Sequence, residues 1–243
     1  MTELDETTTR RGMLAGLGGA GLGVAGATLL GCGSDETEQA DAATPSCTLV
    51  KEQTEGPYYV DLNRVRRNVT EGRPGLRLDL RVKIVNAETC KAMRNAAVEI
   101  WHCDALGRYS GFAQEGTAGK TFMRGIQRTD KNGVAVFRTI YPGWYQGRAL
   151  HIHLKAFTGG RVSGSKFIGG NEQHTGQLFF KESVTDRVAK LSPYNRRDVT
   201  RTRISQDTIY QSQGGSLVHL TRRSKKSFRA GLTARVTMAI DAG

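Results

Sequence analysis

The chain has 243 residues, of which 38% are hydrophobic and 24% are charged, with 30 glycines and only 5 prolines. This composition is typical of a globular protein and excludes a disordered or collagen-like chain. Lys and Arg outnumber Asp and Glu by 35 to 23, but they form no long basic blocks interleaved with aromatic residues, so nucleic acid is not an expected partner.

The first 31 residues have the features of an export signal. Arg10 and Arg11 precede an apolar run rich in Gly, Ala, Leu and Val, which ends directly before Cys32. So many glycines disfavour a permanent membrane helix, because each costs about 1 kcal/mol of helix propensity relative to alanine. The segment resembles twin-arginine signals that end in a bacterial lipobox. We therefore predict an exported, extracytoplasmic protein that is anchored to the cell membrane through a lipidated Cys32.

The rest of the chain is predicted to hold one domain behind a short tether. Residues 32–46 are polar and partly acidic, which suits a flexible linker. Residues 47–243 are long enough to bury roughly 70% of their unfolded surface in a single core. The alternative is a cytosolic protein with a glycine-rich arm, but it does not explain the arginine pair, the apolar run and the cysteine together.

Three cysteines remain if Cys32 carries lipid. An exported protein permits disulfides, and an odd number of cysteines allows at most one intramolecular pair. Their spacing leaves open which two of the three form it: Cys47, Cys90 or Cys103.

Alternating apolar and polar residues organise this domain. From Leu76 to Ile84 every second residue is apolar, which predicts a strand with one face in a core. A tight turn at residues 130–133 predicts a hairpin of the strands before and after it. Short strands separated by turn residues indicate an all-β sandwich or barrel, and we expect an antiparallel β-sandwich core with long loops and one short helix, residues 182–191. The predicted strands span residues 77–84, 97–102, 122–129, 134–140, 150–156, 177–180 and 233–240.

The predicted strand at residues 150–156 carries two histidines at metal-binding spacing. Residues i and i+2 of a strand lie on one face about 6.6 Å apart, so His151 and His153 can reach one ion. The pair alone is a weak signal, because two histidines on a solvated strand are more often merely polar. No Asp or Glu lies close to them in sequence, whereas Tyr109 and Tyr145 lie in loops upstream. Two phenolates and two imidazoles suit an oxidised iron ion.

Three stretches occur in an order that points to a known family. They are residues 101–109, which begin Trp-His and end at Tyr109, residues 141–145 (Tyr-Pro-Gly-Trp-Tyr) and residues 147–153 (Gly-Arg-Ala-Leu-His-Ile-His). Together with the Gly-Pro-Tyr at residues 56–58 they resemble the intradiol ring-cleavage dioxygenases, the family of catechol 1,2- and protocatechuate 3,4-dioxygenases. The resemblance covers about residues 47 to 180. It implies a β-sandwich that holds one non-haem Fe(III) ion through Tyr109, Tyr145, His151 and His153.

The resemblance also implies an activity and further site residues. An intradiol dioxygenase incorporates both atoms of O2 into a catechol-type substrate and gives a cis,cis-muconate-type diacid. Arg148 and Gln177 fall on the family's active-site arginine and glutamine, and Tyr58 would lie in the pocket wall. Tyr145 would, besides binding iron, help to take up a substrate proton.

Two other functions stay open at this point. A non-catalytic β-sandwich that binds ligands or serves as a surface module would have lost at least one of the four ligand positions, and none is replaced. A cupin-type metal oxygenase also carries His-x-His on a strand, but usually adds a Glu and a third His rather than two tyrosines. The identity of the catechol and the oligomeric state are not predicted by the sequence.

Overall fold

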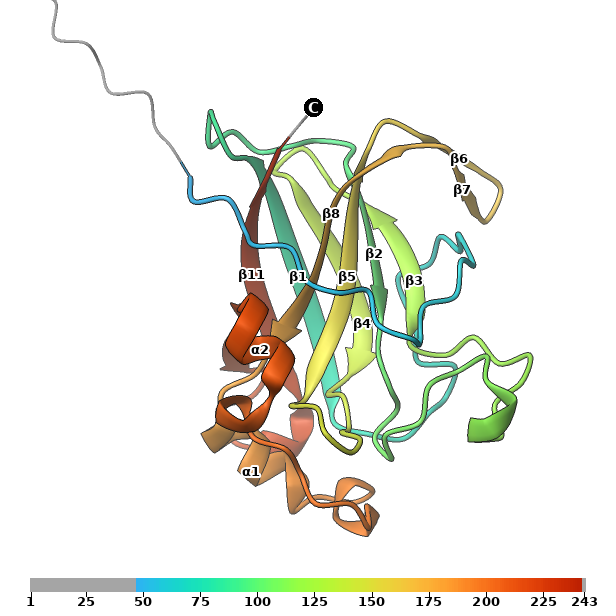
Figure 1. Cartoon of the computed structure of the whole chain (residues 1–243), viewed down its shortest axis with the longest axis vertical. Helices are drawn as coiled ribbons and strands as arrows, with labels where there is room; N and C mark the ends of the chain where they lie inside the picture. Colours follow the sequence, from blue (N-terminus) through green and yellow to red (C-terminus); the bar gives the residue numbers. More distant parts are fainter. Residues whose placement is uncertain (1–46, 242–243) are drawn as a thin grey trace, which may run out of the picture. The chain divides into compact units, whose positions relative to one another are not determined.

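The strand predicted from residue 77 onward lies inside a four-stranded sheet (Figure 1). The computed structural model of the protein describes residues 47–241. The strands of this sheet, in spatial order, are β10 (His219–Arg222), β11 (Leu232–Ile240), β1 (Arg77–Asn86) and β4 (Val134–Ile140). β1 pairs antiparallel with β4 and parallel with β11, so the last long strand lies beside the first.

A second sheet, of five strands, carries the predicted His-x-His strand. In spatial order it consists of β3 (Arg124–Arg128), β2 (Ala97–Trp101), β5 (His151–Thr158), β8 (Asn171–Phe179) and β9 (Ser216–Leu217). β5 is antiparallel to both β2 and β8, and His153 lies opposite Trp101 on one side and Gln177 on the other. The register therefore places these three residues in one row across the sheet.

Apolar side chains that alternate along the strands fill the space between the two sheets. Leu78, Leu80 and Val82 of β1 are fully buried, whereas the residues between them are only half-buried. Ile152 and Leu154 of β5 belong to the same core. Fully burying a side chain of this size contributes about 1.5–3 kcal/mol, so the alternation in the sequence reflects the main force that pairs the sheets. The predicted β-sandwich is confirmed.

The other face of the five-stranded sheet is covered by the segment that follows residue 47. This segment crosses the sheet in front of β8, β5 and β2 (Figure 1). The Gln53 N–H donates to the Thr175 carbonyl, and the Tyr59 hydroxyl donates to the Glu99 carboxylate. Because side chains alternate along β5, His153 points to this covered face and away from the main core.

The predicted hairpin on either side of residues 130–133 is wrong. Both strands exist, as β3 and β4, but β3 pairs with β2 and β4 pairs with β1, so the turn carries the chain from one sheet to the other. The Asp130 carboxylate closes this turn by accepting hydrogen bonds from the N–H groups of Asn132 and Val134. Alternation indicates which face of a strand is buried, but it does not specify the neighbouring strand.

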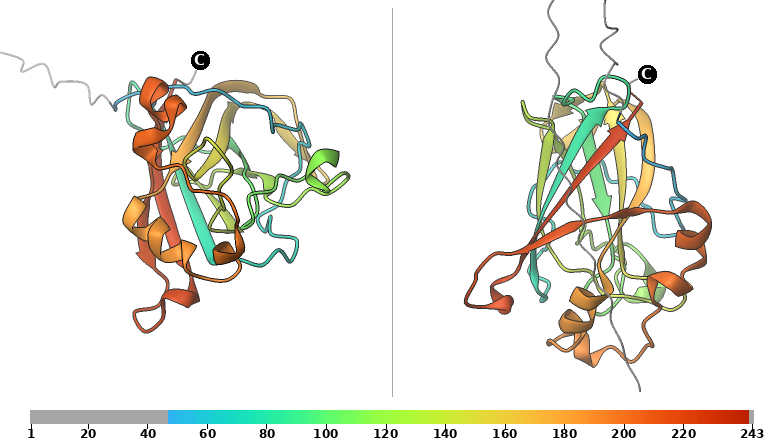
Figure 2. Two further views of the ribbon diagram at one scale, coloured as in Figure 1. Left: turned by 60° about the horizontal axis from the view of Figure 1, so that its bottom comes forward. Right: turned by 90° about the vertical axis from the view of Figure 1, so that its left-hand side faces the viewer.

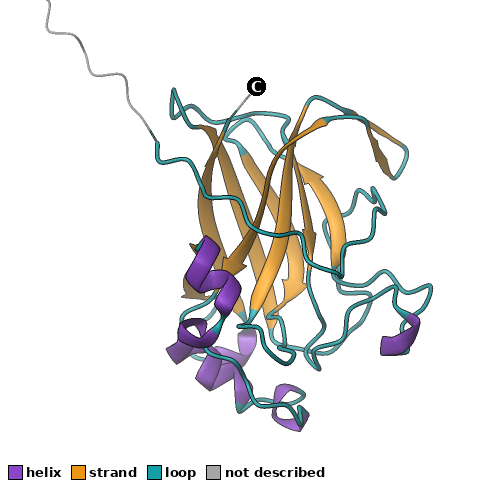
Figure 3. Cartoon of the chain, viewed as in Figure 1, coloured by secondary structure: helices purple, strands orange, loops and turns teal. Residues whose placement is uncertain are grey.

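The α-helices lie together at one end of the sandwich (Figure 2, Figure 3). The helix predicted at residues 182–191 corresponds to α1 (Glu182–Ala189). A second helix, α2 (Thr208–Gln213), was not predicted, because it is too short to show the helical periodicity of apolar residues. In the described part of the chain no helix is both long and apolar enough to cross a membrane. The remaining short elements are β6 (Arg161–Ser163), β7 (Lys166–Ile168) and 3-10 helices at Ala113–Glu115, Tyr194–Arg196, Ile204–Gln206 and Phe228–Ala230.

One disulfide ties the start of the described chain to the turn after β1. It joins Cys47 and Cys90, and the third cysteine, Cys103, is buried and free. The bond closes a loop of 43 residues, for which the loss of chain entropy in the unfolded state gives a stabilisation of about 3–4 kcal/mol. The structure thus selects one of the three pairings that the sequence left open.

Three predictions fall on residues outside the described part of the chain. These are the export signal at residues 1–31, the lipid attachment at Cys32 and the tether at residues 32–46. They stay predictions.

Candidate metal centre

Two histidine side chains at the start of β5 bring their Nε2 atoms within 2.9 Å of each other. The Nδ1 atom of His151 lies 2.6 Å from the Ala149 carbonyl oxygen, and it must donate because a carbonyl only accepts. The Nε2 atom of His151 is therefore the ring nitrogen with the lone pair. Burial lowers the pKa of His151 to about 3 and that of His153 well below its usual value. Both imidazoles are thus neutral near pH 7, the form that binds metal ions.

The ring of His153 is fixed from two sides. Trp101 lies opposite His153 on the neighbouring strand β2. Its ring stacks on the imidazole, with the ring centroids 4.8 Å apart and the planes 5° from parallel. Gly56 approaches the ring from the covering segment, and a Cβ added at Gly56 would lie 3.4 Å from the His153 Cε1 atom. This leaves the Nε2 atom of His153 directed at His151.

Tyr109 is brought to the histidines by a loop that begins where β2 ends. The Asp104 carboxylate organises this loop by accepting hydrogen bonds from the N–H groups of Leu106 at 3.0 Å and Arg108 at 3.1 Å. Asp and Asn favour such turns because their short side chains can bond to the backbone two residues on. Asp104 thus directs Tyr109 toward the site, a role that the sequence did not predict.

Tyr145 comes from a second loop, which packs tightly against the first. A Cβ at Gly143 would lie 2.5 Å from the Asp104 carbonyl oxygen, and one at Gly107 would lie 2.1 Å from that of Trp144. Both distances are shorter than a Cβ atom tolerates from a carbonyl oxygen, so only glycine allows the two loops to approach this closely. These two glycines therefore allow the loops to bring the two tyrosines together.

The two phenols and the two imidazoles converge on one point. The Tyr145 hydroxyl lies 3.3 Å from the Nε2 atom of His151. The ring of Tyr109 lies 5.7 Å from that of Tyr145 and 6.4 Å from that of His153, measured between centroids. Burial raises the pKa of both phenols above the usual value, and the proximity of Tyr145 raises that of Tyr109 further. All four residues implied as ligands by the sequence thus lie together.

The donor set fits a cation. The Tyr109 hydroxyl is buried and forms no hydrogen bond of normal geometry with a described residue, although the Tyr145 phenol lies beside it. A buried hydroxyl left in this way normally costs about 1–3 kcal/mol. A highly charged metal ion would remove this cost, because it holds a phenol as phenolate despite a raised pKa. Between Cys47 and Asp241, no three His, Cys, Asp or Glu side chains gather as a metal site. A metal ion at this point would therefore need the phenol oxygens, unlike the Glu and third His of a cupin.

Tyr58 lies with its ring against both phenols. Its ring stacks on that of Tyr109, with centroids 4.3 Å apart and planes 5° from parallel. Its ring also meets Tyr145 edge to face at 5.6 Å. Offset and edge-to-face contacts of this kind stabilise the placement of aromatic rings, so Tyr58 fixes the orientation of both phenols.

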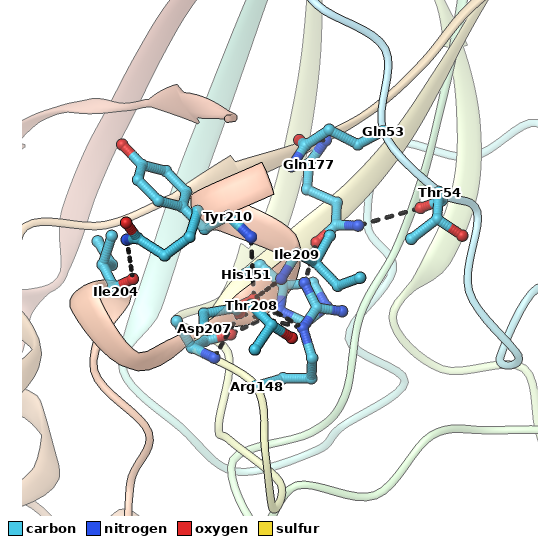
Figure 4. A network of polar contacts seen from close by, with 12 residues as sticks. Gln53, Thr54, Arg148, His151, Gln177, Ile204, Asp207, Thr208, Ile209 and Tyr210 are labelled. Carbon is cyan, nitrogen blue, oxygen red and sulfur yellow. Dashed lines mark hydrogen bonds and ion pairs between the residues drawn. The ribbon is translucent and has the colours of Figure 1, made fainter. Parts of the chain in front are cut away.

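Arg148 lies beside the histidines, held by two partners (Figure 4). Its Nη2 atom donates to Oε1 of Gln177 at 2.5 Å, and its Nε atom donates to the Asp207 carboxylate at 3.0 Å. Gln177 is fixed in turn by donating its Nε2 hydrogen to the Thr54 carbonyl at 3.0 Å. The guanidinium is therefore a fixed positive charge near the four converging groups.

Asp207 is a site residue that the sequence analysis missed. Its carboxylate is fully buried, caps α2 by accepting from the N–H groups of Ile209 and Tyr210, and accepts from the Ala149 N–H at 2.8 Å. The carbonyl of Ala149 is the acceptor for His151, so Asp207 fixes both Arg148 and the backbone that orients His151 (Figure 4). The only signal in the sequence was a helix-capping residue, 58 positions after Ala149.

The sequence is similar to that of known oxygenases. A family model described as "Dioxygenase" matches residues 54–183. Catechol 1,2-dioxygenase 2 of Acinetobacter lwoffii is 35% identical over 95 residues, which are 37% of this chain and 34% of that protein. Catechol 1,2-dioxygenase of Acinetobacter baylyi is 34% identical over 110 residues, which are 43% of this chain and 35% of that protein. The similarity thus spans about a third of the length of these curated relatives.

A solved structure matches more of the chain. The intradiol ring-cleavage dioxygenase from Tetranychus urticae superposes with a TM-score of 0.71 at 32% sequence identity. The superposition covers 81% of this chain and 96% of that chain. The similarity therefore extends over nearly the whole of that protein.

Proposed function

The chain belongs to the intradiol ring-cleavage dioxygenase family, and on this premise we propose that it cleaves the ring of a catechol-type aromatic compound with O2. The proposed reaction incorporates both oxygen atoms and gives a cis,cis-muconate-type diacid. One observation carries the proposal: two neutral imidazoles and two phenols, one of them without a hydrogen-bond partner among the described residues, meet beside a largely buried arginine.

The proposed cofactor is a single non-haem Fe(III) ion held by Tyr109, Tyr145, His151 and His153. Bound there, ferric iron supplies a Lewis acid that draws electron density from a catecholate ring. The two tyrosines have different roles in this proposal. Tyr109 is 1% exposed, whereas Tyr145 is half-buried and thus more accessible, so the Tyr145 oxygen is the one that accepts a proton from a substrate hydroxyl.

Arg148 is proposed to stabilise negative charge on the substrate ring. Its positively charged guanidinium is positioned before substrate binds by Gln177 and Asp207. A fixed charge in a site from which water is excluded stabilises a developing anion more than solvent does. Tyr58, stacked on Tyr109, closes the wall beside it and shields the site from water.

The proposed function is tested by colour and by oxygen uptake. Protein loaded with one iron per chain should be coloured, because a tyrosinate bound to ferric iron absorbs visible light by charge transfer, and catechol should shift the band. Oxygen uptake is then measured with catechol, protocatechuate, hydroxyquinol and caffeate, and product spectra distinguish intradiol from extradiol cleavage. A colourless protein with stoichiometric iron would contradict the tyrosinate ligands, and extradiol products would contradict the reaction.

We also propose that the protein is exported and anchored by lipid at Cys32. The support is the arginine pair and apolar run before Cys32, together with the Cys47–Cys90 disulfide, a bond that persists in oxidising compartments. Replacing Cys32 by alanine should move the protein from the membrane fraction to the soluble fraction without changing its turnover. Equal membrane association of Cys32→Ala and wild type would contradict the anchor.

A further inference from the structure

The outward face of the four-stranded sheet carries a concentration of positive charge. Residues 47–241 contain 33 of the 35 Lys and Arg residues but only 16 of the 23 Asp and Glu residues. Arginines of β1, β4 and β11, with one from the segment before β1, surround a hollow of about 190 Å³. We call this the arginine face, and its charged residues are Arg67, Arg77, Arg81, Arg138, Arg235 and Asp79.

The one acid on the arginine face is already paired. Asp79 binds Arg77 at 3.1 Å and also binds Arg223, on the hairpin between β10 and β11, at 2.8 Å. The other four arginines of the face have no carboxylate within 4.0 Å in the described part of the chain: Arg67, Arg81, Arg138 and Arg235. The positive charge of these four arginines is therefore not neutralised by a nearby acidic side chain of the described chain.

The strand register forces like charges together on this face. Arg81 of β1 lies directly opposite Arg235 of β11, and on its other side it is opposite Val136 of β4, two residues from Arg138. Like charges directly opposite each other destabilise a sheet. The fold does not need these arginines, because Leu80 and Val82 supply the core on the inner face. An anion bound between them would remove the repulsion.

The arginine face is open to a large partner. Both α-helices lie at one end of the sandwich (Figure 3), so neither covers it. Of its arginines, Arg67, Arg138 and Arg235 are exposed. Among the residues that the structure describes, no aromatic side chain lines the hollow, so the bases of single-stranded nucleic acid would find none to stack on. The strongly exposed large apolar residues of the described chain are Leu49, Val162, Ile168 and Leu217, and none of them lines the hollow, where the apolar lining residue is the half-buried Val136. The face thus offers no large, strongly exposed apolar side chain to insert into a membrane.

We propose that the arginine face binds an acidic polysaccharide. The planar guanidinium fork of arginine matches a carboxylate or sulfate group with two parallel hydrogen bonds. A hollow between arginines admits an anionic group that projects from a flexible chain, whereas a flat bilayer surface cannot enter it. Arg77 and Arg81 of β1, together with the arginines on the neighbouring strands, allow several anionic groups of one polymer to be bound at the same time. Such multivalent contact strengthens the binding without any new kind of interaction. Such binding would hold the protein on a carbohydrate matrix.

The test uses the full chain and two polymers, heparin for sulfate and polygalacturonate for carboxylate. Affinity is measured at an ionic strength of about 0.15 M, where long-range attraction is screened. The variant Arg81→Gln/Arg235→Gln is compared with Lys120→Gln/Arg161→Gln, which removes the same charge from exposed residues outside the face. We expect the first variant to bind at least about tenfold more weakly, because one charge-assisted contact is equivalent to about that factor. The control should bind like wild type.

Several outcomes would overturn the proposal. Equal losses in the two variants would mean that only net charge matters, and absence of binding to both polymers would exclude the acidic polysaccharide. Tighter binding to duplex DNA or to vesicles of anionic phospholipid would identify a different class of partner. Both variants should retain wild-type turnover and thermal stability, because neither pair belongs to the proposed catalytic site and removing Arg81 and Arg235 relieves repulsion. Which polymer binds more tightly distinguishes sulfate from carboxylate recognition.

Discussion

Replacing Tyr109 by phenylalanine should yield a folded protein that no longer retains iron, loses its visible absorption and has no measurable turnover. The removed hydroxyl is buried and has no hydrogen-bond partner in the described chain. The ring itself stacks on Tyr58, and phenylalanine keeps that contact. The iron-free variant should therefore be at least as stable as iron-free wild type, because an unsatisfied buried hydroxyl costs about 1–3 kcal/mol. Iron content, visible spectra and urea unfolding of the metal-free forms measure these effects.

Tyr194→Phe is the matched control for this variant. Tyr194 is equally buried, but its hydroxyl accepts from the Leu76 N–H at 3.0 Å and donates to the Tyr141 carbonyl at 2.6 Å. Its loss should lower stability by about 1–3 kcal/mol and leave iron and colour unchanged. Tyr109→Phe with a full complement of iron and an unaltered spectrum would remove Tyr109 from the ligand set. The two substitutions thus separate a ligand from a structural phenol by opposite effects.

The fold could be predicted from the sequence where one face of a strand is buried and the other is not. In β1 the alternation is sharp, and its core residues are buried as expected. In β8 the prediction began at residue 177, whereas the strand begins at Asn171 with an irregular register near Phe157 of β5. The residues in the first half of β8 are polar and show no alternation of apolar and polar side chains, which is the pattern that predicts a strand. The sequence could not show which strands pair, because the tight turn at Asp130 closes locally whether or not the flanking strands pair with each other.

The residues of the candidate site likewise fall into those that the sequence predicted and those that it did not. The motif residues were found because His-x-His spacing and tyrosines in fixed order are visible along the chain. Asp104 and Asp207 were not found, because each acts through the backbone of a neighbouring loop rather than through a recognisable spacing. The arginine face was hidden for a related reason: Arg81 and Arg235 are 154 positions apart, and only the parallel pairing of β1 with β11 makes them neighbours. Net charge was evident from the sequence, and its location was not.

Replacing Asp207 by asparagine should retain iron but lower turnover by about 100-fold, because a displacement of about 1 Å in a positioning group can cost that factor. Asparagine is also a good helix cap, so the start of α2 is preserved while the charge that holds Arg148 is lost. Arg148 has only 14% of its side chain exposed, and leaving a buried charge without its partner costs about 3–5 kcal/mol of stability. Turnover, KM, iron content and urea unfolding are measured together.

The double variant Asp207→Asn/Arg148→Gln distinguishes positioning from simple stabilisation. Removing both charges should recover much of the lost stability, since no unpaired buried charge remains, but it should not recover turnover, because the guanidinium proposed to stabilise the substrate anion is absent. Asp186→Asn, which removes an acid that pairs with Arg201 and has 45% of its side chain exposed, should leave turnover and iron unchanged. If Asp207→Asn turned over substrate at the wild-type rate, Asp207 would be only a helix cap. If turnover returned in the double variant together with stability, Arg148 would have no part in the reaction, and the pairing of Arg148 with Asp207 would serve the fold alone.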